Sequence, residues 1–347
     1  MSYTTRWIAP SNIAIVKYWG KFENQRPANP SLSFTLTNSH TDTQLTVEEK
    51  EGEKSGAPHV EVWFSGEKKE DFVPKIHKFL LSVIDDYPWL RGKYLKIETA
   101  NTFPHSSGIA SSASGMAALA CCIEDIHTTY IDPQEFRKQK ASYAARLGSG
   151  SACRSIYGGF VQWGKSDDGE GSDDHAISVG AVHEQFQTIF DYILILDSGK
   201  KIVSSTEGHS MMNGHPYAKQ RFDQGRHNTI ALKEILRSGD WRAFISLMES
   251  EALTLHAMMM TSNPPFILMK PKTLEVISYI WRFRDDTGQN VGFTLDAGAN
   301  LHLVFDKSAL AAVENQLLPE IQYLCEQNSV LKDFIGKGPY KHTNPHP

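Results

Sequence analysis

The amino-acid sequence predicts an α+β fold built from more than one lobe. Apolar runs typical of strands alternate irregularly with segments of helical periodicity, whereas a doubly wound parallel sheet would show regular alternation. The 347 residues exceed the usual size of a single-core domain, and a composition with 40% hydrophobic and 22% charged residues is that of an ordinary globular protein. We therefore expect the whole chain to fold, with a ligand cleft between lobes.

The expected elements follow from hydrophobic periodicity along the chain. Short strands are predicted at Gln44–Glu49, Val60–Phe64, Tyr94–Thr99, Gly159–Trp163, Tyr192–Leu196, Gly292–Leu295 and Leu301–Phe305. Helices are predicted at Val73–Asp86, Ser112–Ile126, Pro133–Leu147, Lys219–Arg237, Asp240–His256, Pro271–Arg284 and Ala309–Gln316. The polar stretch Ser166–Asp174 is typical of an exposed turn. Because a new strand-and-helix series starts at Tyr192, we expect an N-terminal lobe over residues 1–188 and a C-terminal lobe over 189–347.

Charge and cysteine content exclude several classes of protein. The formal net charge of −5 gives no general attraction to nucleic acid or to an anionic membrane, so an anionic ligand would need a local basic cluster. The N-terminus lacks the layout of a signal peptide, and no stretch is long enough to span a bilayer. The four cysteines show no paired metal spacing and are expected to be reduced, packed thiols. We expect a cytoplasmic protein with neither nucleic-acid nor membrane partners.

The segment Asn101–Ala120 is predicted to run from a strand through a loop into a helix. Its small residues would let backbone N–H groups approach an anion at the helix N-terminus; they include Ser106, Ser107, Gly108, Ser111 and Ser112. The pattern is not a Walker A loop, because no Gly-Lys-Ser/Thr closes it. The segment is a candidate phosphate cradle, with a simple turn as the alternative.

Two further segments place cations among apolar or small residues. In Asn12–Lys21, Lys17 and Lys21 lie four residues apart, and a buried Lys17 would need an anionic partner. The alternative is that both lysines snorkel from a strand end. In Gly148–Ser155, two serine hydroxyls and Arg154 would form a donor set for a carboxylate or phosphate. The alternative there is a helix C-cap followed by a turn.

A carboxylate at a strand end is a further catalytic candidate. Asp296 follows the first apolar run of Gly292–Phe305, where a lysine such as Lys17 would keep it ionised. The alternative is a hairpin turn whose polar residues satisfy the backbone. The hydroxyl cluster within Asp197–His209 and the histidine His256 are expected to be structural, and no histidine pair has the spacing of a zinc site.

Taken in order, six motifs make the chain resemble the diphosphomevalonate decarboxylase family of the GHMP kinase superfamily. They are NIAIVKYWGK, PSLSFTL, FPHSSGIASSASG, GSGSACRSIYGGFVQW, VSST and LDAGAN, and the resemblance runs from about residue 8 to about residue 305. It implies a GHMP-kinase fold with a ribosomal-protein-S5-like N-terminal lobe and a ferredoxin-like C-terminal lobe around a deep cleft. It also implies a homodimer that uses ATP and Mg²⁺.

The implied activity is that of an ATP-dependent carboxy-lyase. In the family, ATP phosphorylates the C3 hydroxyl of mevalonate 5-diphosphate, and the phosphate then leaves with CO₂ to give isopentenyl diphosphate. The nearest alternatives are a phosphomevalonate decarboxylase and a mevalonate-phosphate 3-kinase that stops at the 3-phosphate. A different class is a catalytically silent GHMP-fold binding protein. The combination of Lys17 and Asp296 favours the decarboxylase over the kinase.

The same resemblance implies roles for individual residues. The catalytic set would be Asp296 beside the C3 hydroxyl, Lys17 facing it, Arg154 on the substrate carboxylate and Ser205 near the transferred phosphoryl group. ATP would be bound by Pro104, Ser107, Gly108, Ile109, Ala110, Ser111 and Ser112. The substrate would be bound by Tyr18, Lys21, Lys75, Ser149, Gly150, Ser151 and Arg154. No residue is assigned as a metal ligand.

The chain also departs from the family pattern. His105-Ser106-Ser107 stands where Thr-Ala-Ala is common, and Ala299 where proline is common, which bears on nucleotide affinity and loop rigidity. Lys75 occupies an arginine position of relatives, exchanging a bidentate fork for a point charge. That exchange bears on the preference between a monophosphate and a diphosphate substrate.

Overall fold

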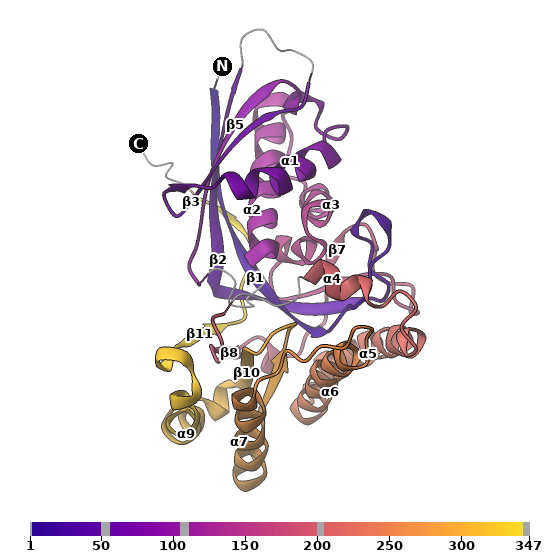
Figure 1. Cartoon of the computed structure of the whole chain (residues 1–347), viewed down its shortest axis with the longest axis vertical. Helices are drawn as coiled ribbons and strands as arrows, with labels where there is room; N and C mark the ends of the chain where they lie inside the picture. Colours follow the sequence, from indigo (N-terminus) through magenta and orange to yellow (C-terminus); the bar gives the residue numbers. More distant parts are fainter. Residues whose placement is uncertain (1, 50–55, 105–110, 200–204, 343–347) are drawn as a thin grey trace.

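The computed structural model describes residues 2–49, 56–104, 111–199 and 205–342, the side chains of Ser205 and Thr206 excepted. These residues form one sheet of eight strands and one of four. In Figure 1 the larger sheet and the helices on its face make the upper part of the molecule, and the smaller sheet with its helices makes the lower part. No helix in the described part of the chain combines the length and apolar character needed to cross a bilayer.

Two long antiparallel strands form the centre of the larger sheet, β1 (Ser2–Val16) and β2 (Ser31–Glu49). The other strands are β3 (His59–Phe64), β4 (Glu67–Lys68), β5 (Lys93–Asn101), β6 (Phe160–Trp163), β7 (Ala176–Ser178) and β12 (Tyr340–Lys341). The path runs β12-β1-β2-β5-β3-β4, with β6 paired to β2 and β7 to β6. The hairpin of β6 and β7 confirms the turn predicted at Ser166–Asp174.

The strands β1 and β2 show that the prediction of short strands only was wrong. Every residue of β1 from Trp7 to Val16 is buried, so this strand lacks the alternation of polar and apolar residues that marks a half-buried strand. The first residues of β2, from Ser31 to Leu36, are buried in the same way. Alternation of polar and apolar residues therefore predicted only the second half of β2, where one face of the strand is exposed.

Three helices cover one face of the larger sheet, α1 (Val73–Ser82), α2 (Ser111–Ile126) and α3 (Lys138–Gly148) (Figure 1). The central helix α2 is buried continuously from Met116 to its end, which explains a composition that is apolar all round. The start of α3 was predicted too early, at Pro133, because Arg137 is extended and bound to Glu124. All four cysteines are free and buried, as predicted.

The smaller sheet is antiparallel, and the remaining helices other than α4 lie in the same part of the molecule (Figure 1). Its order is β11-β8-β10-β9, formed by β8 (Ile189–Leu194), β9 (Val291–Leu295), β10 (Leu301–Asp306) and β11 (Val330–Phe334). The helices are α4 (Ser205–Ser210), α5 (Ala218–Ser238), α6 (Trp241–Met260), α7 (Pro271–Thr287), α8 (Leu310–Ala312) and α9 (Leu318–Ile321). Between α5 and α6, Gly239 adopts φ +79° and Asp240 accepts a hydrogen bond from the Ala243 amide, so one helix stops and the next begins at once. The helix predicted at Ala309–Gln316 is confirmed, and the chain there runs without a break from α8 through the π-helical turn Val313–Leu317 into α9.

A single hydrophobic cluster joins the two sheets. It packs Phe34 and Phe160 of the larger sheet against Phe186, Phe244 of α6 and Val304 of β10. The aromatic rings pack closely: the ring centroid of Phe244 lies 5.0 Å from that of Phe186 and 6.4 Å from that of Phe160. The two parts of the molecule therefore share apolar burial, and we retain the boundary at residue 188 as a proposal.

This shared cluster leads to a stability prediction. Phe244→Ala should lower the free energy of unfolding by about 3–5 kcal/mol, because the fully buried ring leaves a cavity between rigid neighbours. The measurement is urea denaturation followed by tryptophan fluorescence. Leu274→Ala on the exposed face of α7 is the matched control and should stay within about 0.5 kcal/mol of the parent. A loss below about 1 kcal/mol for Phe244→Ala would contradict the shared core.

Candidate active site

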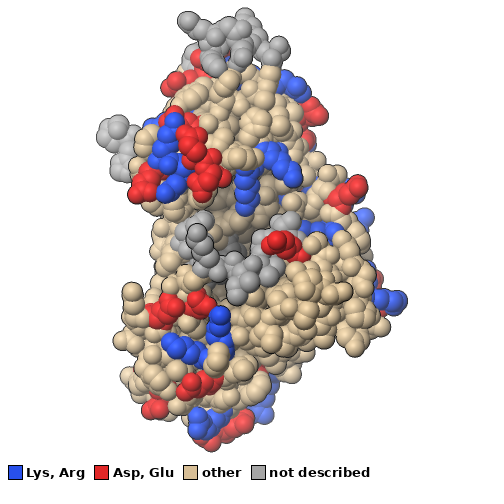
Figure 2. Space-filling model, in the orientation of Figure 1, with Lys and Arg blue, Asp and Glu red and all other residues tan. Residues whose placement is uncertain are grey.

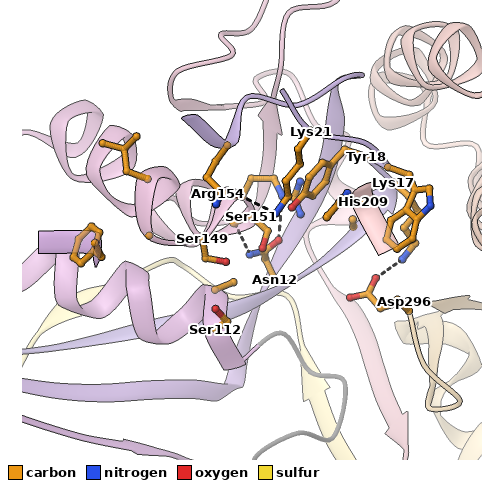
Figure 3. Close-up of a pocket in the computed structure, with 18 of the residues that line it drawn as sticks. Asn12, Lys17, Tyr18, Lys21, Ser112, Ser149, Ser151, Arg154, His209 and Asp296 are labelled. Atoms are coloured by element: carbon orange, nitrogen blue, oxygen red, sulfur yellow. Dashed lines mark hydrogen bonds and ion pairs between the residues drawn. The ribbon is translucent and has the colours of Figure 1, made fainter. Parts of the chain in front are cut away.

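A cavity of about 550 Å³ lies where the end of β1, the helices α1 to α3 and the β9–β10 turn meet (Figure 3). Its polar lining comes from segments far apart in the sequence. These residues include Asn12, Lys17, Tyr18, Lys21, Lys75, Lys78, Ser112, Ser149, Ser151, Arg154, His209 and Asp296. The fold thus collects most of the predicted site residues around one space.

The prediction that a buried Lys17 needs an anionic partner is confirmed. Its Nζ lies 2.8 Å from Oδ1 of Asp296, which follows β9 in the turn toward β10. The Lys17 side chain is 3% exposed and the Asp296 side chain 31% exposed, so the carboxylate reaches the cavity while the ammonium stays behind it. His256 Nε2 donates to the carbonyl of Asp296 at 3.1 Å, and burial lowers the pKa of His256 to about 4. The aspartate is therefore fixed through both its side chain and its backbone.

The main chain of Lys17 is held by a buried ion pair between helices α5 and α6. Glu251 of α6 accepts the Lys17 N–H at 2.8 Å, and Arg221 of α5 donates to the Lys17 carbonyl. Arg221 and Glu251 are themselves 2.6 Å apart with fully buried side chains. Asn29 donates to the same carbonyl at 3.0 Å. Where β1 leaves its ladder, both backbone groups of Lys17 are thus satisfied by side chains.

Arg154 is a buried cation without a carboxylate partner among the described residues. It lies on the 3₁₀ helix Gly150–Ile156, and Ser31 and Asn12 accept hydrogen bonds from its Nη1 and Nε. Its guanidinium lies 5.6 Å from the ring centroid of Tyr18. Within the described chain nothing accepts a bond from Nη2. Since an unpaired buried charge is costly, this position is suited to an anionic ligand.

Two lysines extend this positive character along the cavity. Lys75 donates to Ser112 at the start of α2 at 2.6 Å, and Lys21 donates to Gln25 at 2.9 Å. Neither pairs with a carboxylate in the described part of the chain. Burial, aided by the charge of Lys75, lowers the pKa of Lys21 to about 8. Figure 2 shows acidic and basic side chains interspersed over one face of the molecule, so on this face the cations of the cavity are not part of a broad basic surface.

A second cavity of about 220 Å³ adjoins the first. Lys75, Ser111 and Ser112 lie at this boundary, with Lys75 and Ser112 lining both spaces. The remainder of the second cavity contains one carboxylate, that of Asp71. Its other lining residues are apolar or carry hydroxyl or amide groups: Thr41, Thr43, Phe64, Phe72, Ile76, Ile97, Thr99, Asn101, Gly115, Met116 and Leu119. A polar ligand with one flat, weakly polar end would fit the two cavities together.

Two family models match nearly the whole chain. Residues 9–176 match the diphosphomevalonate decarboxylase-like N-terminal domain, and residues 192–343 match the mevalonate 5-diphosphate decarboxylase C-terminal domain. The chain belongs to the diphosphomevalonate decarboxylase family. It is 30% identical to the diphosphomevalonate decarboxylase of Candida albicans over 88% of this chain and 85% of that protein.

Solved structures agree with this family membership. The mevalonate diphosphate decarboxylase of Staphylococcus aureus is 27% identical, with a TM-score of 0.85 over 99% of this chain and 98% of its own. A structure described as MDDEF in complex with MVAPP, AMPPCP and magnesium is 27% identical, with a TM-score of 0.84 over 99% of both chains. The protein therefore has the GHMP-kinase fold of these decarboxylases, as the resemblance implied.

Some residues expected from the decarboxylase family lie outside the cavity or outside the described residues. Gly150 lies behind the cavity wall, where an added Cβ would meet Trp163 at 2.7 Å. Pro104 lines neither cavity. Ser107, Gly108, Ile109 and Ala110 lie outside the described residues, as does the side chain of Ser205. Their roles stay predictions.

Sequence reasoning missed several groups that shape this decarboxylase-family site. Arg221 and Glu251 lie on two predicted helices in which no motif marked them, and Asn12 and His209 lie at the ends of segments that were selected for other residues. The prediction that His256 is a satisfied core histidine is confirmed, and its contact with Asp296 was an additional finding. The one usable signal was a charged residue within an apolar stretch, as at Glu251 in ESEALTLHAMMM.

The lowered pKa of Lys21 predicts a pH dependence of anion binding. A bound anion favours the charged lysine, so above about pH 8 binding of inorganic pyrophosphate should require uptake of a proton. Below that pH the ammonium is already formed. The affinity should therefore weaken above pH 8, by up to about 10-fold per pH unit until the raised pKa of the complex is reached.

Calorimetry in buffers of different ionisation enthalpy measures this uptake. Lys21→Arg is the matched variant, since its guanidinium stays charged. Its proton uptake should be smaller than that of the parent, with the part due to Lys75, whose pKa is also lowered by burial, remaining. The titration of pyrophosphate itself is common to both proteins and cancels in the comparison. Equal proton uptake by both proteins at pH 8.5 would contradict the prediction.

Proposed function

We propose that this protein is an ATP-dependent carboxy-lyase that converts mevalonate 5-diphosphate to isopentenyl diphosphate, ADP, phosphate and CO₂. The observation that carries the proposal is the enclosed pair of Lys17 and Asp296 beside the cations Arg154, Lys21 and Lys75, which have no carboxylate partner among the described residues. A carboxylate held at the cavity wall suits a reacting hydroxyl, and the cations suit a substrate with one carboxylate and a diphosphate. Membership of the decarboxylase family supports the same reaction.

The first step transfers the γ-phosphoryl group of ATP to the C3 hydroxyl. The hydroxyl oxygen forms a bond to phosphorus while the bond to ADP breaks, and the hydroxyl proton leaves. Asp296 is placed to accept that proton or to stabilise the positive charge that develops on the hydroxyl, and Lys17 fixes its position. Since phosphoryl transfer passes through a loose transition state, positioning contributes more than strong base catalysis.

The second step breaks two bonds of the phosphorylated substrate. The electron pair of the bond between the carboxylate carbon and C2 forms the C2–C3 double bond, while the C3–oxygen bond breaks and phosphate departs. Arg154, with Ser149 and Ser151 beside it, would hold the carboxylate so that these two bonds align. Tyr18 and Gly150 shape the wall behind the substrate, since the ring of Tyr18 lies against Arg154 and Trp163.

The residues present fit ATP and Mg²⁺. Ser111 and Ser112 at the start of α2 would meet the phosphates, and the second cavity would take the nucleoside. In the described part of the chain no group of three or more acidic, histidine or cysteine side chains is placed to hold a metal ion. Because Mg²⁺ keeps several waters and binds through substrate phosphates, it would be held chiefly by the nucleotide and would neutralise phosphate charge there.

The alternative activities differ from the proposed one either in a product that is released or in the number of phosphates on the substrate. Lys21 and Lys75 present two separate cations, and a diphosphate has the length and charge to engage both, whereas a monophosphate reaches one. A 3-kinase would release ADP without CO₂, and a silent binding protein would release neither. The homodimer and the cytoplasmic location implied by the family complete the proposal, and sedimentation velocity tests the first of them.

Product stoichiometry tests the proposed reaction directly. Purified protein is incubated with ATP, Mg²⁺ and either mevalonate 5-diphosphate or the 5-monophosphate, and CO₂, ADP and phosphate are followed separately. We expect equal release of the three products with the diphosphate. ADP release without CO₂ would show a kinase, and preference for the monophosphate would show a phosphomevalonate decarboxylase.

Asp296→Asn should lower kcat by about 10²–10⁴-fold with little change in substrate KM. The variant should stay folded, with a lowered melting temperature because the buried Lys17 loses its anionic partner. The amide keeps the shape and an acceptor for Lys17 but loses the charge that the reacting hydroxyl requires. Steady-state kinetics and thermal unfolding measure both quantities. Asp286→Asn on the exposed face of α7 is the matched control, and a near-normal kcat for Asp296→Asn would overturn the assigned role.

Arg154→Lys should lower kcat/KM by about 10-fold to 100-fold, since a charged hydrogen bond contributes about 1.5–3 kcal/mol. A lysine cannot bond Asn12, Ser31 and a carboxylate with the fixed fork that arginine presents. The ratio of CO₂ to ADP should also fall, because a misplaced carboxylate uncouples the two steps. Arg282→Lys on α7 serves as the control, and unchanged coupling in Arg154→Lys would place Arg154 outside the reaction.

A further inference from the structure

His209 is a buried histidine in the wall of the larger cavity with no role in the reaction as described above. It lies on α4 and is 6% exposed. Its ring stacks on Tyr18, with centroids 4.6 Å apart and planes at 24°, and contacts Trp19 at 4.7 Å (Figure 3). The preceding Gly208 packs so closely on Trp19 that an added Cβ would meet the indole at 2.5 Å. The position of the imidazole is therefore tightly fixed against the end of β1.

The surroundings of the ring determine its tautomer. The backbone N–H of Gly20 donates to Nδ1 of His209 at 3.0 Å, so Nδ1 carries no proton. Burial and the positive charge of Lys21 lower the pKa of His209 well below its ordinary value, so the ring is neutral. A neutral imidazole then has its proton on Nε2. No described residue accepts a hydrogen bond from Nε2, which leaves this donor for a ligand in the cavity.

We propose that His209 is a specificity-determining residue whose Nε2–H donates a hydrogen bond to the diphosphate of the substrate. This inference rests on the proposed function. The ring adjoins Tyr18, Gly20 and Lys21, whereas the expected nucleotide phosphates meet the start of α2. The ligand is therefore the substrate arm rather than ATP.

A neutral donor is better suited to this position than another cation. The positive charge of Lys75 already disfavours the charged form of Lys21. A further cation beside Lys21 would disfavour the charged forms of both groups. The imidazole adds a directed hydrogen bond without that repulsion. Because the ring and its tautomer are both fixed, the Nε2–H points in one direction. It can therefore bond only a phosphoryl oxygen that is correctly placed.

Nitrogen-15 NMR of histidine tests the tautomer and the contact without any turnover. In the free protein we expect Nε2 of His209 to be protonated and Nδ1 not, and the Nε2–H signal to move on addition of inorganic pyrophosphate. His209→Phe assigns the signal. A ring protonated on Nδ1, or a His209 signal unchanged at saturating pyrophosphate, would overturn the proposal.

Kinetics test the specificity. His209→Phe keeps a ring between Tyr18 and Trp19 but removes both nitrogens, and should raise the KM for mevalonate 5-diphosphate about 10-fold or more, with a smaller change in kcat and none in the KM for ATP. His209→Gln, whose amide nitrogen can reach the place of Nε2, should recover part of this loss. A KM unchanged in both variants, or an equal rise in the KM for ATP, would overturn the proposal.

His215 provides a matched control. It is also buried, but its Nε2 bonds the Met258 carbonyl and its Nδ1 the Tyr217 amide, and it does not line the cavity. His215→Phe should lower the melting temperature without changing the KM for the substrate. If the parent protein fails to decarboxylate mevalonate 5-diphosphate, the proposed function fails, and the pyrophosphate titration alone then decides whether His209 is an anion-binding donor.

Discussion

The buried pair of Arg221 and Glu251 is the interaction on which the geometry of the site depends. The pair binds the backbone of Lys17 from helices α5 and α6, just beyond the end of β1. The residues that follow Lys17 face the cavity or its walls. A shift of the Lys17 backbone would therefore displace each of them. A charge pair this deep is expensive to desolvate, and removing one partner would cost about 3–5 kcal/mol because the other would be left uncompensated. The ion pair is therefore better explained by the position that it fixes for the Lys17 backbone than by a gain in net stability.

The electrostatic design of the cavity follows from that anchoring. One cation, Lys17, is neutralised inside the wall by Asp296, while Arg154, Lys21 and Lys75 are left without carboxylates in the described chain. The protein bears a net charge of −5, so this local excess opposes its overall balance. Water is partly excluded there, and interactions between charges are stronger than at the surface. Lys21 and Lys75 repel each other in the free protein, and a bound anionic substrate would offset that repulsion.

Sequence reasoning predicted the pieces of the site better than their support. Lys17 and Asp296 could be paired because a lysine in an apolar run demands an anion and an aspartate at a strand end offers one. Helices α5, α6 and α7 were also located by periodicity. By contrast, β1 is buried on both faces and has no period-two signal, and the roles of Arg221 and His209 exist only through contacts made by distant segments. Such contacts are set by tertiary packing, which a single sequence does not display.

The pairing of the last strand with the first has a consequence for biosynthesis. Residues of β12 bond to Trp7 and Ile8 of β1, and Lys341 forms an ion pair at 2.9 Å with Asp125. That edge of β1 consequently stays open until the more than 300 residues between Ile8 and Tyr340 have been translated. At about 5–20 residues per second, the nascent chain carries an uncovered β edge for tens of seconds. Chaperone protection during translation would matter most for this interval.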